Sequence, residues 1–149
     1  MKHDLSDLLD ALEGTAYAVD TRARFIAVGA RAWRRFALDN DAAELADPSV
    51  LLGCDLFDFI LGDEVRQAYR QVMERARQGE PEVTLAMRCD APDAARLMRL
   101  VVSALTSKGR LAGYLFQCVL LDERARPPLG LFAFGTQGGR DQSWPTIAM

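Results

Sequence analysis

The chain has 149 residues, of which 50% are hydrophobic and 26% charged, with a net charge of −3 and a pI of about 5.2. This composition is typical of a single globular domain with its own core. The slight acidity gives no support to nucleic-acid binding, and no apolar run approaches the ~18 residues of a membrane span. Because the N-terminus is too acidic for a secretory signal, we expect a cytoplasmic protein that binds neither nucleic acid nor membrane.

The N-terminal segment, residues 1–13, predicts a short amphipathic helix. Leu5, Leu8, Leu9 and Leu12 recur at helical spacing between acidic residues, and Gly14 provides a stop. Such a leucine stripe must cover an apolar surface. It either lies on the domain that follows or pairs with the same helix in a second copy, and the two arrangements can coexist.

A strand, a turn, a second strand and a helix are predicted next. Residues 15–19 and 24–28 have the pattern of strands, separated by a polar turn that begins at Asp20. Gly29 ends the second strand. The helix predicted over 30–38 places Trp33 and Phe36 on one face, and its arginines at other angles are expected to be largely solvated.

The middle of the chain predicts short helices followed by the longest one. Residues 39–52 predict a loop with one short helix that Pro48 ends. Asp55 is positioned to cap another short helix, with Leu56, Phe59 and Ile60 turned inward. The long helix is predicted over 62–78, with acidic residues first and arginines last, as the helix dipole favours. Its apolar stripe consists of Val65, Tyr69, Val72, Met73 and Ala76.

Three strands are predicted at the end of the domain, over residues 82–89, 96–105 and 111–121. The first alternates between apolar and polar residues, whereas the other two are apolar on both faces, which indicates that both faces near them are covered. The tail, 122–149, combines apolar and glycine-rich segments. It is expected either to fold back over the sheet or to lead toward another module.

The order of these elements resembles the PAS superfamily of sensory domains across residues 14–121. The specific similarities are Tyr17-Ala-Val-Asp20 and Phe25-Ile-Ala-Val28 before an aromatic helix, and Gly53-x-x-Leu56-Phe57 before the long helix. The chain departs from the family at Gly29 and Ala30, where PAS sequences typically have Asn. The resemblance implies an α+β fold: a five-stranded antiparallel sheet in the order 2-1-5-4-3, with helices on one face.

The resemblance also implies a site for a ligand or cofactor between the sheet and the helices. The candidate lining residues would serve equally well as plain core: Tyr17, Phe25, Trp33, Phe59, Tyr69, Met87, Arg96, Met98 and Leu100. Arg96 shares the parity of Met98 and Leu100, and its planar fork would suit a carboxylate at the pocket edge. The alternative for Arg96 is an ion pair within the 88–96 hairpin, which carries Asp90 and Asp93.

Common PAS cofactors have little support in this sequence. Histidine-ligated haem is disfavoured because the only histidine is His3, and a flavin–cysteine adduct is disfavoured because Cys54 directly follows Gly53 without the family's partner residues. No Cys-x-x-Cys or histidine pair suggests a metal site. Cys54, Cys89 and Cys118 are therefore interpreted as reduced structural thiols, and the identity of any cofactor stays open.

Two functions fit these observations. The first is a sensory or interaction domain that binds a small ligand or a signalling protein partner and has no catalysis of its own. The second is a homodimerisation module whose pocket is filled by side chains, with Leu5, Leu8, Leu9 and Leu12 at the dimer interface. Enzyme activity is not expected, because the sequence has neither a phosphate-binding glycine loop nor a Ser/His/Asp set.

Overall fold

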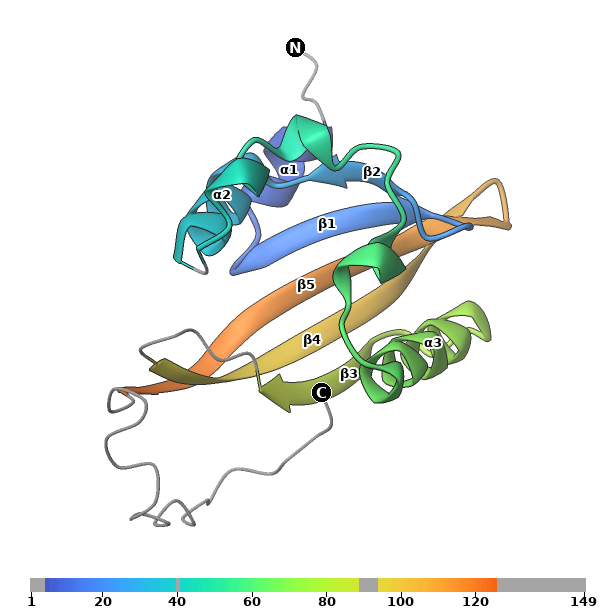
Figure 1. Cartoon of the computed structure of the whole chain (residues 1–149). Coiled ribbons are helices and arrows are strands. Elements are labelled where there is room, and N and C mark those ends of the chain that lie inside the picture. The colour runs from blue at the N-terminus through green and yellow to red at the C-terminus, as the bar shows by residue number, and fades with distance from the viewer. Residues whose placement is uncertain (1–4, 40, 89–93, 126–149) are drawn as a thin grey trace.

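An antiparallel sheet forms the centre of the protein (Figure 1). The computed structural model describes residues 5–39, 41–88 and 94–125. The strands lie in the order β2-β1-β5-β4-β3, which confirms the α+β class and the expected topology and is consistent with a PAS-like fold. They are β1 (Thr15–Asp20), β2 (Phe25–Val28), β3 (Val83–Arg88), β4 (Ala94–Ser107) and β5 (Arg110–Ala125).

The first strand of the sheet pairs with the last. Tyr17 of β1 lies opposite Val28 of β2 on one side and opposite Phe116 of β5 on the other. β4 and β5 form a long hairpin, and β5 continues past the expected end at residue 121. Successive side chains of β1 point to opposite faces of the sheet, and both sets are covered here, since the four residues 16–19 are all buried.

Two helices and a 3₁₀ turn cover the inner face, which we define as the face carrying Tyr17 and Val19. They are α2 (Ala30–Asp39), α3 (Asp63–Arg77) and η3 (Leu56–Phe59). The predicted stripe of α3 is confirmed, since Val65, Tyr69, Val72, Met73 and Ala76 are all buried. Asp55 caps η3 as expected, because its Oδ1 accepts a hydrogen bond from the Phe57 N–H at 2.9 Å.

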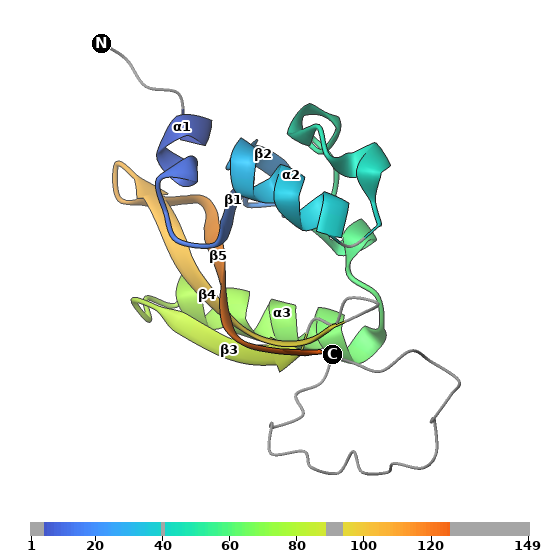
Figure 2. The same ribbon diagram turned by 90° about the vertical axis from the view of Figure 1, so that its left-hand side faces the viewer.

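The α1 helix (Leu5–Asp10) lies on the opposite, outer face. Its one buried residue, Leu9, packs with Ala16, Ala18 and Ala27, which alternate with the inner-face residues. Figure 2 shows α1 at the end of the sheet formed by β1 and β2. The expectation of helices on one face thus holds for α2 and α3, and the N-terminal helix lies on the domain that follows it, as one of its two expected arrangements had it. Cover of the outer face is partial, because Leu121 near the end of β5 is 48% exposed.

The 39–52 segment differs from its prediction of one short helix. It contains two 3₁₀ turns, η1 (Ala43–Leu45) and η2 (Pro48–Val50). Pro48 begins the second turn, where the missing N–H costs nothing because the first turn of a helix has no intrahelical acceptor for it. The Asp47 carboxylate caps this turn by accepting from the Ser49 N–H at 3.0 Å.

The segment after η2 protects the free edge of β2. The Phe25 N–H donates to the Cys54 carbonyl at 3.0 Å, and the Gly53 N–H donates to the Phe25 carbonyl at 2.9 Å. An isolated bridge also joins Arg24 to Asp55. These bonds occupy backbone groups that an edge strand would otherwise present for pairing with another chain.

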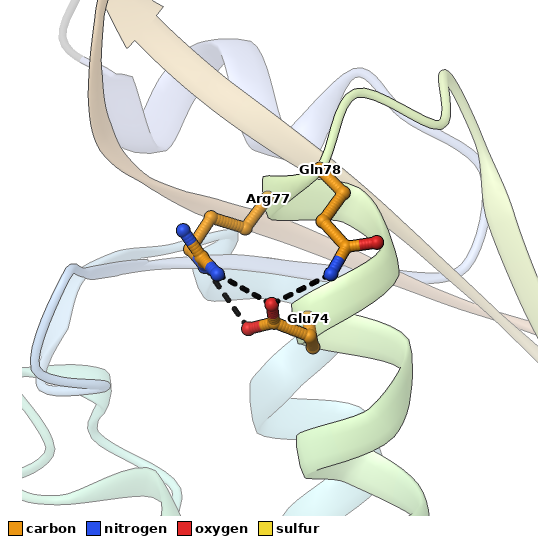
Figure 3. A network of polar contacts seen from close by, with 3 residues as sticks. All are labelled: Glu74, Arg77 and Gln78. Carbon is orange, nitrogen blue, oxygen red and sulfur yellow. Dashed lines mark hydrogen bonds and ion pairs between the residues drawn. The ribbon is translucent and has the colours of Figure 1, made fainter.

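The C-terminal end of α3 carries a polar cluster (Figure 3). Glu74 accepts hydrogen bonds from Arg77 Nε at 2.9 Å and from Gln78 Nε2 at 2.9 Å, and it forms an ion pair with the Arg77 guanidinium. These bonds from Arg77 lower the pKa of the Glu74 carboxyl. The cluster is exposed, so its contribution to stability is small.

In the described part of the chain, no helix is long and apolar enough to cross a membrane.

Asp10 links α1 to the start of α2. Its Oδ1 accepts a hydrogen bond from the Arg31 N–H at 2.9 Å, which is an N-cap supplied from another helix. A Cβ on Gly29 would stand 3.2 Å from this oxygen and 3.2 Å from the Leu9 carbonyl. The glycine therefore allows α1 to approach closely, and Asp10 caps the helix that Gly29 cannot cap with a side chain.

Replacing Asp10 by Ala tests this cap. We expect Asp10→Ala to lower the free energy of unfolding by about 1 kcal/mol, because the Arg31 N–H loses its acceptor. Asp10→Asn is the matched control, since its side-chain oxygen still accepts the bond and should retain most of the stability. Urea unfolding followed by circular dichroism measures both variants, and equal losses in the two would contradict the capping role.

Candidate functional site

An apolar cavity of about 400 Å³ lies between the inner face of the sheet and the elements that cover it. Its walls come from β1, β2, α2, η3, α3, β3 and β5. Six of the nine lining residues expected from the sequence border this apolar cavity: Tyr17, Phe25, Trp33, Phe59, Tyr69 and Met87.

Aromatic rings form one side of the apolar cavity. The Tyr17 ring stacks on Phe116 with centroids 5.1 Å apart and lies 5.3 Å from the Phe25 ring. Phe59 meets Phe25 edge-on at 5.9 Å, although it is 40% exposed rather than fully turned inward. Offset and edge-on contacts of this kind favour particular ring positions, so the wall is held in place without a ligand.

Two buried tyrosine hydroxyls, those of Tyr17 and Tyr69, provide polar groups in this otherwise apolar wall. Burial and the neighbouring Tyr69, which is hydrogen-bonded to it, raise the pKa of Tyr17 well above 10.0. The Tyr69 hydroxyl also lies 4.0 Å from Met87 Sδ. Both rings are almost fully buried. At neutral pH Tyr17 is therefore uncharged, and the pair suits a carbonyl or hydroxyl better than a charged group.

Hydrogen bonds and a cation–π contact hold α2 and η3 in place beside the apolar cavity. The Trp33 indole N–H donates to the Leu45 carbonyl at 2.7 Å, which leaves the ring itself to line the space. η3 is held against α3 because Arg66 Nε donates to the Phe57 carbonyl at 3.3 Å and the Arg70 guanidinium lies 4.8 Å from the Phe57 ring centroid. These contacts fix the rim of the apolar cavity.

A polar cleft of about 440 Å³ adjoins the apolar cavity, and the two share Thr15, Phe36 and Cys118 as wall residues. The polar cleft lies between the α1–β1 connection, α2 and the distal ends of β4 and β5. Six charged residues line it: Asp10, Arg31, Arg35, Asp39, Arg96 and Glu123. Sequence reasoning placed the arginines of α2 in solvent and so missed this cleft, although their i, i+4 spacing shows that Arg31 and Arg35 share a helix face.

The three remaining candidate lining residues lie outside the apolar cavity. Arg96 and Met98 border the polar cleft, and Arg96 Nε donates to Glu123 Oε2 at 2.8 Å. Leu100 is fully buried in the main core. One ion partner of Arg96 thus comes from the neighbouring strand, and the hairpin acids considered from the sequence, Asp90 and Asp93, lie outside the described residues.

The expected dimer leucines are divided between two environments. Leu9 packs on the protein's own sheet, whereas Leu5, Leu8 and Leu12 are 42%, 56% and 37% exposed. His3, Cys89 and the tail beyond residue 125 lie outside the described residues. Cys54 donates a weak hydrogen bond from Sγ to the Val50 carbonyl at 3.4 Å. Within residues 5–39, 41–88 and 94–125, no group of three His, Cys, Asp or Glu side chains could hold a metal.

Comparison with known proteins gives no match from which a function could be assigned. No protein-family model matches the chain, and no curated protein shows significant sequence similarity to it. The fold and the two adjoining spaces are therefore the observations from which a function can be argued.

The Tyr17 hydroxyl predicts a loss of stability in alkali. Its pKa in the folded state lies above the value near 10 of an unfolded chain, so unfolding releases a proton once the pH exceeds about 10. Stability is fully present below that pH and falls above it, by up to about 1.4 kcal/mol per pH unit for this group. Urea unfolding between pH 8 and 11 should show a shallower decline for Tyr17→Phe than for the wild type. Parallel declines would mean that Tyr17 ionises equally in both states.

Proposed function

We propose that the protein is a cytoplasmic sensory domain of the PAS type, which binds a small, largely apolar ligand and passes the bound state to a protein partner without catalysis. The observation that carries this proposal is the apolar cavity between the sheet and α2, η3 and α3. Its volume of about 400 Å³ lies within the ~300–1,000 Å³ range of small-molecule sites. An aromatic lining with a few polar groups is also characteristic of such sites.

The position of the apolar cavity supports the PAS interpretation. It is bounded by β1, β3 and β5 of a sheet in the PAS-like order and by the long helix that precedes the last three strands. The resemblance implied a ligand space at this place. The Tyr17 and Tyr69 hydroxyls would orient a ligand that carries a carbonyl or hydroxyl, while the surrounding rings supply apolar contact.

Paired substitutions on α3 test whether this space takes a ligand. Val65 and Val72 are both buried residues of α3, but of the two only Val65 lines the apolar cavity. We expect Val65→Phe to fill the space with little loss of stability and to abolish binding of a neutral apolar probe, 1-decanol. Val72→Phe should overpack the core and lower the free energy of unfolding by about 1–3 kcal/mol.

Isothermal titration with 1-decanol and urea unfolding measure the two effects. Saturable one-to-one binding to the wild type, lost in Val65→Phe, supports the ligand site. Absence of probe binding to the wild type would contradict the proposal. A loss of stability in Val65→Phe as large as in Val72→Phe would also contradict it, because the space would then be packed rather than available.

Exposed leucines of α1 and of the turn that follows it favour a second candidate function, homodimerisation. Leu5, Leu8 and Leu12 leave an apolar surface beside the one residue of α1 that is buried on the sheet. A second copy of this helix would cover that surface. This function is compatible with ligand binding, because the leucines and the apolar cavity involve different residues.

Light scattering of matched arginine variants tests the dimer. We expect the wild type to be a dimer and Leu8→Arg to shift it to monomer, because a charge would be buried at the contact. Leu52→Arg is the control, since Leu52 is 51% exposed and lies outside α1. A wild-type monomer, or a dimer that survives Leu8→Arg, would rule out this interface.

A further inference from the structure

The two edge strands of the sheet, β2 and β3, differ in how their outer edges are covered. The segment after η2 is bonded to the edge of β2 through Phe25, Gly53 and Cys54. β3 lies at the other margin of the sheet (Figure 1), and among the described strands it pairs with β4 alone. In an antiparallel pair, every second residue directs its N–H and C=O away from the partner strand. The described part of the chain therefore leaves the outer edge of β3 without a neighbouring strand.

β3 has few of the features that keep an exposed edge strand from pairing. Its six residues, Val-Thr-Leu-Ala-Met-Arg, include neither proline nor lysine, and their one charge, Arg88, stands at the end. Its register with β4 is continuous from Val83 to Arg88, without a bulge. Natural sheets protect their edges with such residues and bulges, or cover them with another segment. A regular and mostly apolar edge of this kind is suited to take a further strand.

The tail that follows β5 starts at the end of the sheet from which it can supply that strand. Arg88 lies beside Leu97 of β4, and Leu97 lies beside Asp122 of β5. Since β3 and β5 are both antiparallel to β4, they run toward the same end, and a chain that turns back there is antiparallel to β3. A strand beyond β3 would lie three strand spacings from β5, which is ~14 Å. Residues 126–130 span up to ~17 Å when extended, so the chain from Leu131 onward can lie along β3.

The sequence of the tail divides into a spacer and a segment with the composition of a strand. Pro127 and Pro128 lack N–H donors and favour an extended backbone, which suits a crossing better than pairing in a sheet. Residues 129–134, Leu-Gly-Leu-Phe-Ala-Phe, carry no charge, and the next charged residue is Arg140. Phenylalanine is enriched in strands. The segment that can reach the edge of β3 thus matches the apolar character of that edge.

We propose that residues 131–134 of the tail form a sixth strand, antiparallel to β3, on its outer edge. A second copy of the chain could offer a strand to the same edge. The tail, however, is attached to the sheet, and its effective concentration is on the order of millimolar, so it occupies the edge first at micromolar protein concentrations. Since Met87 of β3 borders the apolar cavity, the added strand supports one wall of that space. The inference does not depend on whether a ligand binds there.

Amide hydrogen exchange in the full chain, followed by NMR, tests the added strand. In the wild type, the β3 amides that point away from β4 should exchange at least about 10-fold more slowly than those of an unstructured chain. Backbone contacts between β3 and residues 131–134 should accompany this protection. Leu131→Pro/Phe132→Pro should abolish both, because proline cannot donate to a sheet and one of two adjacent residues must face β3. Gln137→Pro/Gly138→Pro is the matched control outside the apolar segment and should change neither.

The β3 amides bonded to β4 should stay protected in every variant, which verifies that the sheet is folded. Fast exchange of the outward amides in the wild type would mean that the edge is open and the proposal is wrong. Protection that survives Leu131→Pro/Phe132→Pro would mean that a different segment covers the edge. Protection that rises with protein concentration, without contacts from residues 131–134, would assign the edge to a second copy and overturn the proposal.

Discussion

The alternation of side chains along β1 is the constraint on which the rest of the structure depends. β1 lies between β2 and β5, so neither edge of it is free. Tyr17 and Val19 point to the inner face, where Tyr17 stacks on Phe116 and borders the apolar cavity. Ala16 and Ala18 point to the outer face, where their small side chains let Leu9 of α1 pack closely. A shift of one residue in this strand would exchange the two sets. The apolar cavity would then lose its aromatic wall, and α1 would lose the small residues on which it packs.

Asp10 connects two helices that lie on opposite faces of the sheet, α1 and α2. α1 lies on the outer face, yet its last residue caps α2, which belongs to the inner face. The contact occurs at the end of the sheet where Gly29 carries no side chain to keep the helices apart. A helix N-terminus leaves unsatisfied N–H groups, and here one of them is satisfied by a residue that precedes the entire sheet in sequence.

The sequence predicted the features that local patterns determine. The stripe of α3 and the cap at Asp55 each follow from spacing within one element, and the structure has both. The alternation predicted for β3 is seen at its two ends, whereas Leu85 and Ala86 in its middle are both half-buried. The order of the strands came from resemblance to a family, because pairing between β1 and β5 joins residues about a hundred positions apart. The sequence predicts only that Pro48 ends a helix, whereas in the structure Pro48 begins the 3₁₀ turn η2. A proline is compatible with either position, because the first residues of a helical turn need no N–H.

The candidate site was predictable in its apolar part and not in its polar part. Aromatic residues at inward positions of β1, β2, α2 and α3 must meet above the sheet, so most of the apolar lining could be listed from periodicity and the expected topology. The polar cleft depends on relations between distant segments: Arg31 and Arg35 on α2, Asp10 from α1, and Arg96 already paired with Glu123. Charged side chains obey no burial rule that would bring them together from sequence alone.

The position of α2 follows from these relations. Its Trp33 and Phe36 border the apolar cavity, Arg31 and Arg35 border the polar cleft, and its first turn is tied to α1. A molecule that displaces this helix must therefore alter the Asp10–Arg31 hydrogen bond or move α1 with it. α1 has one buried residue, Leu9, whereas α3 buries five. α1 therefore resists such movement less than α3 does. Of the three helices, α1 is therefore the least firmly packed, and its last residue, Asp10, both caps α2 and borders the polar cleft.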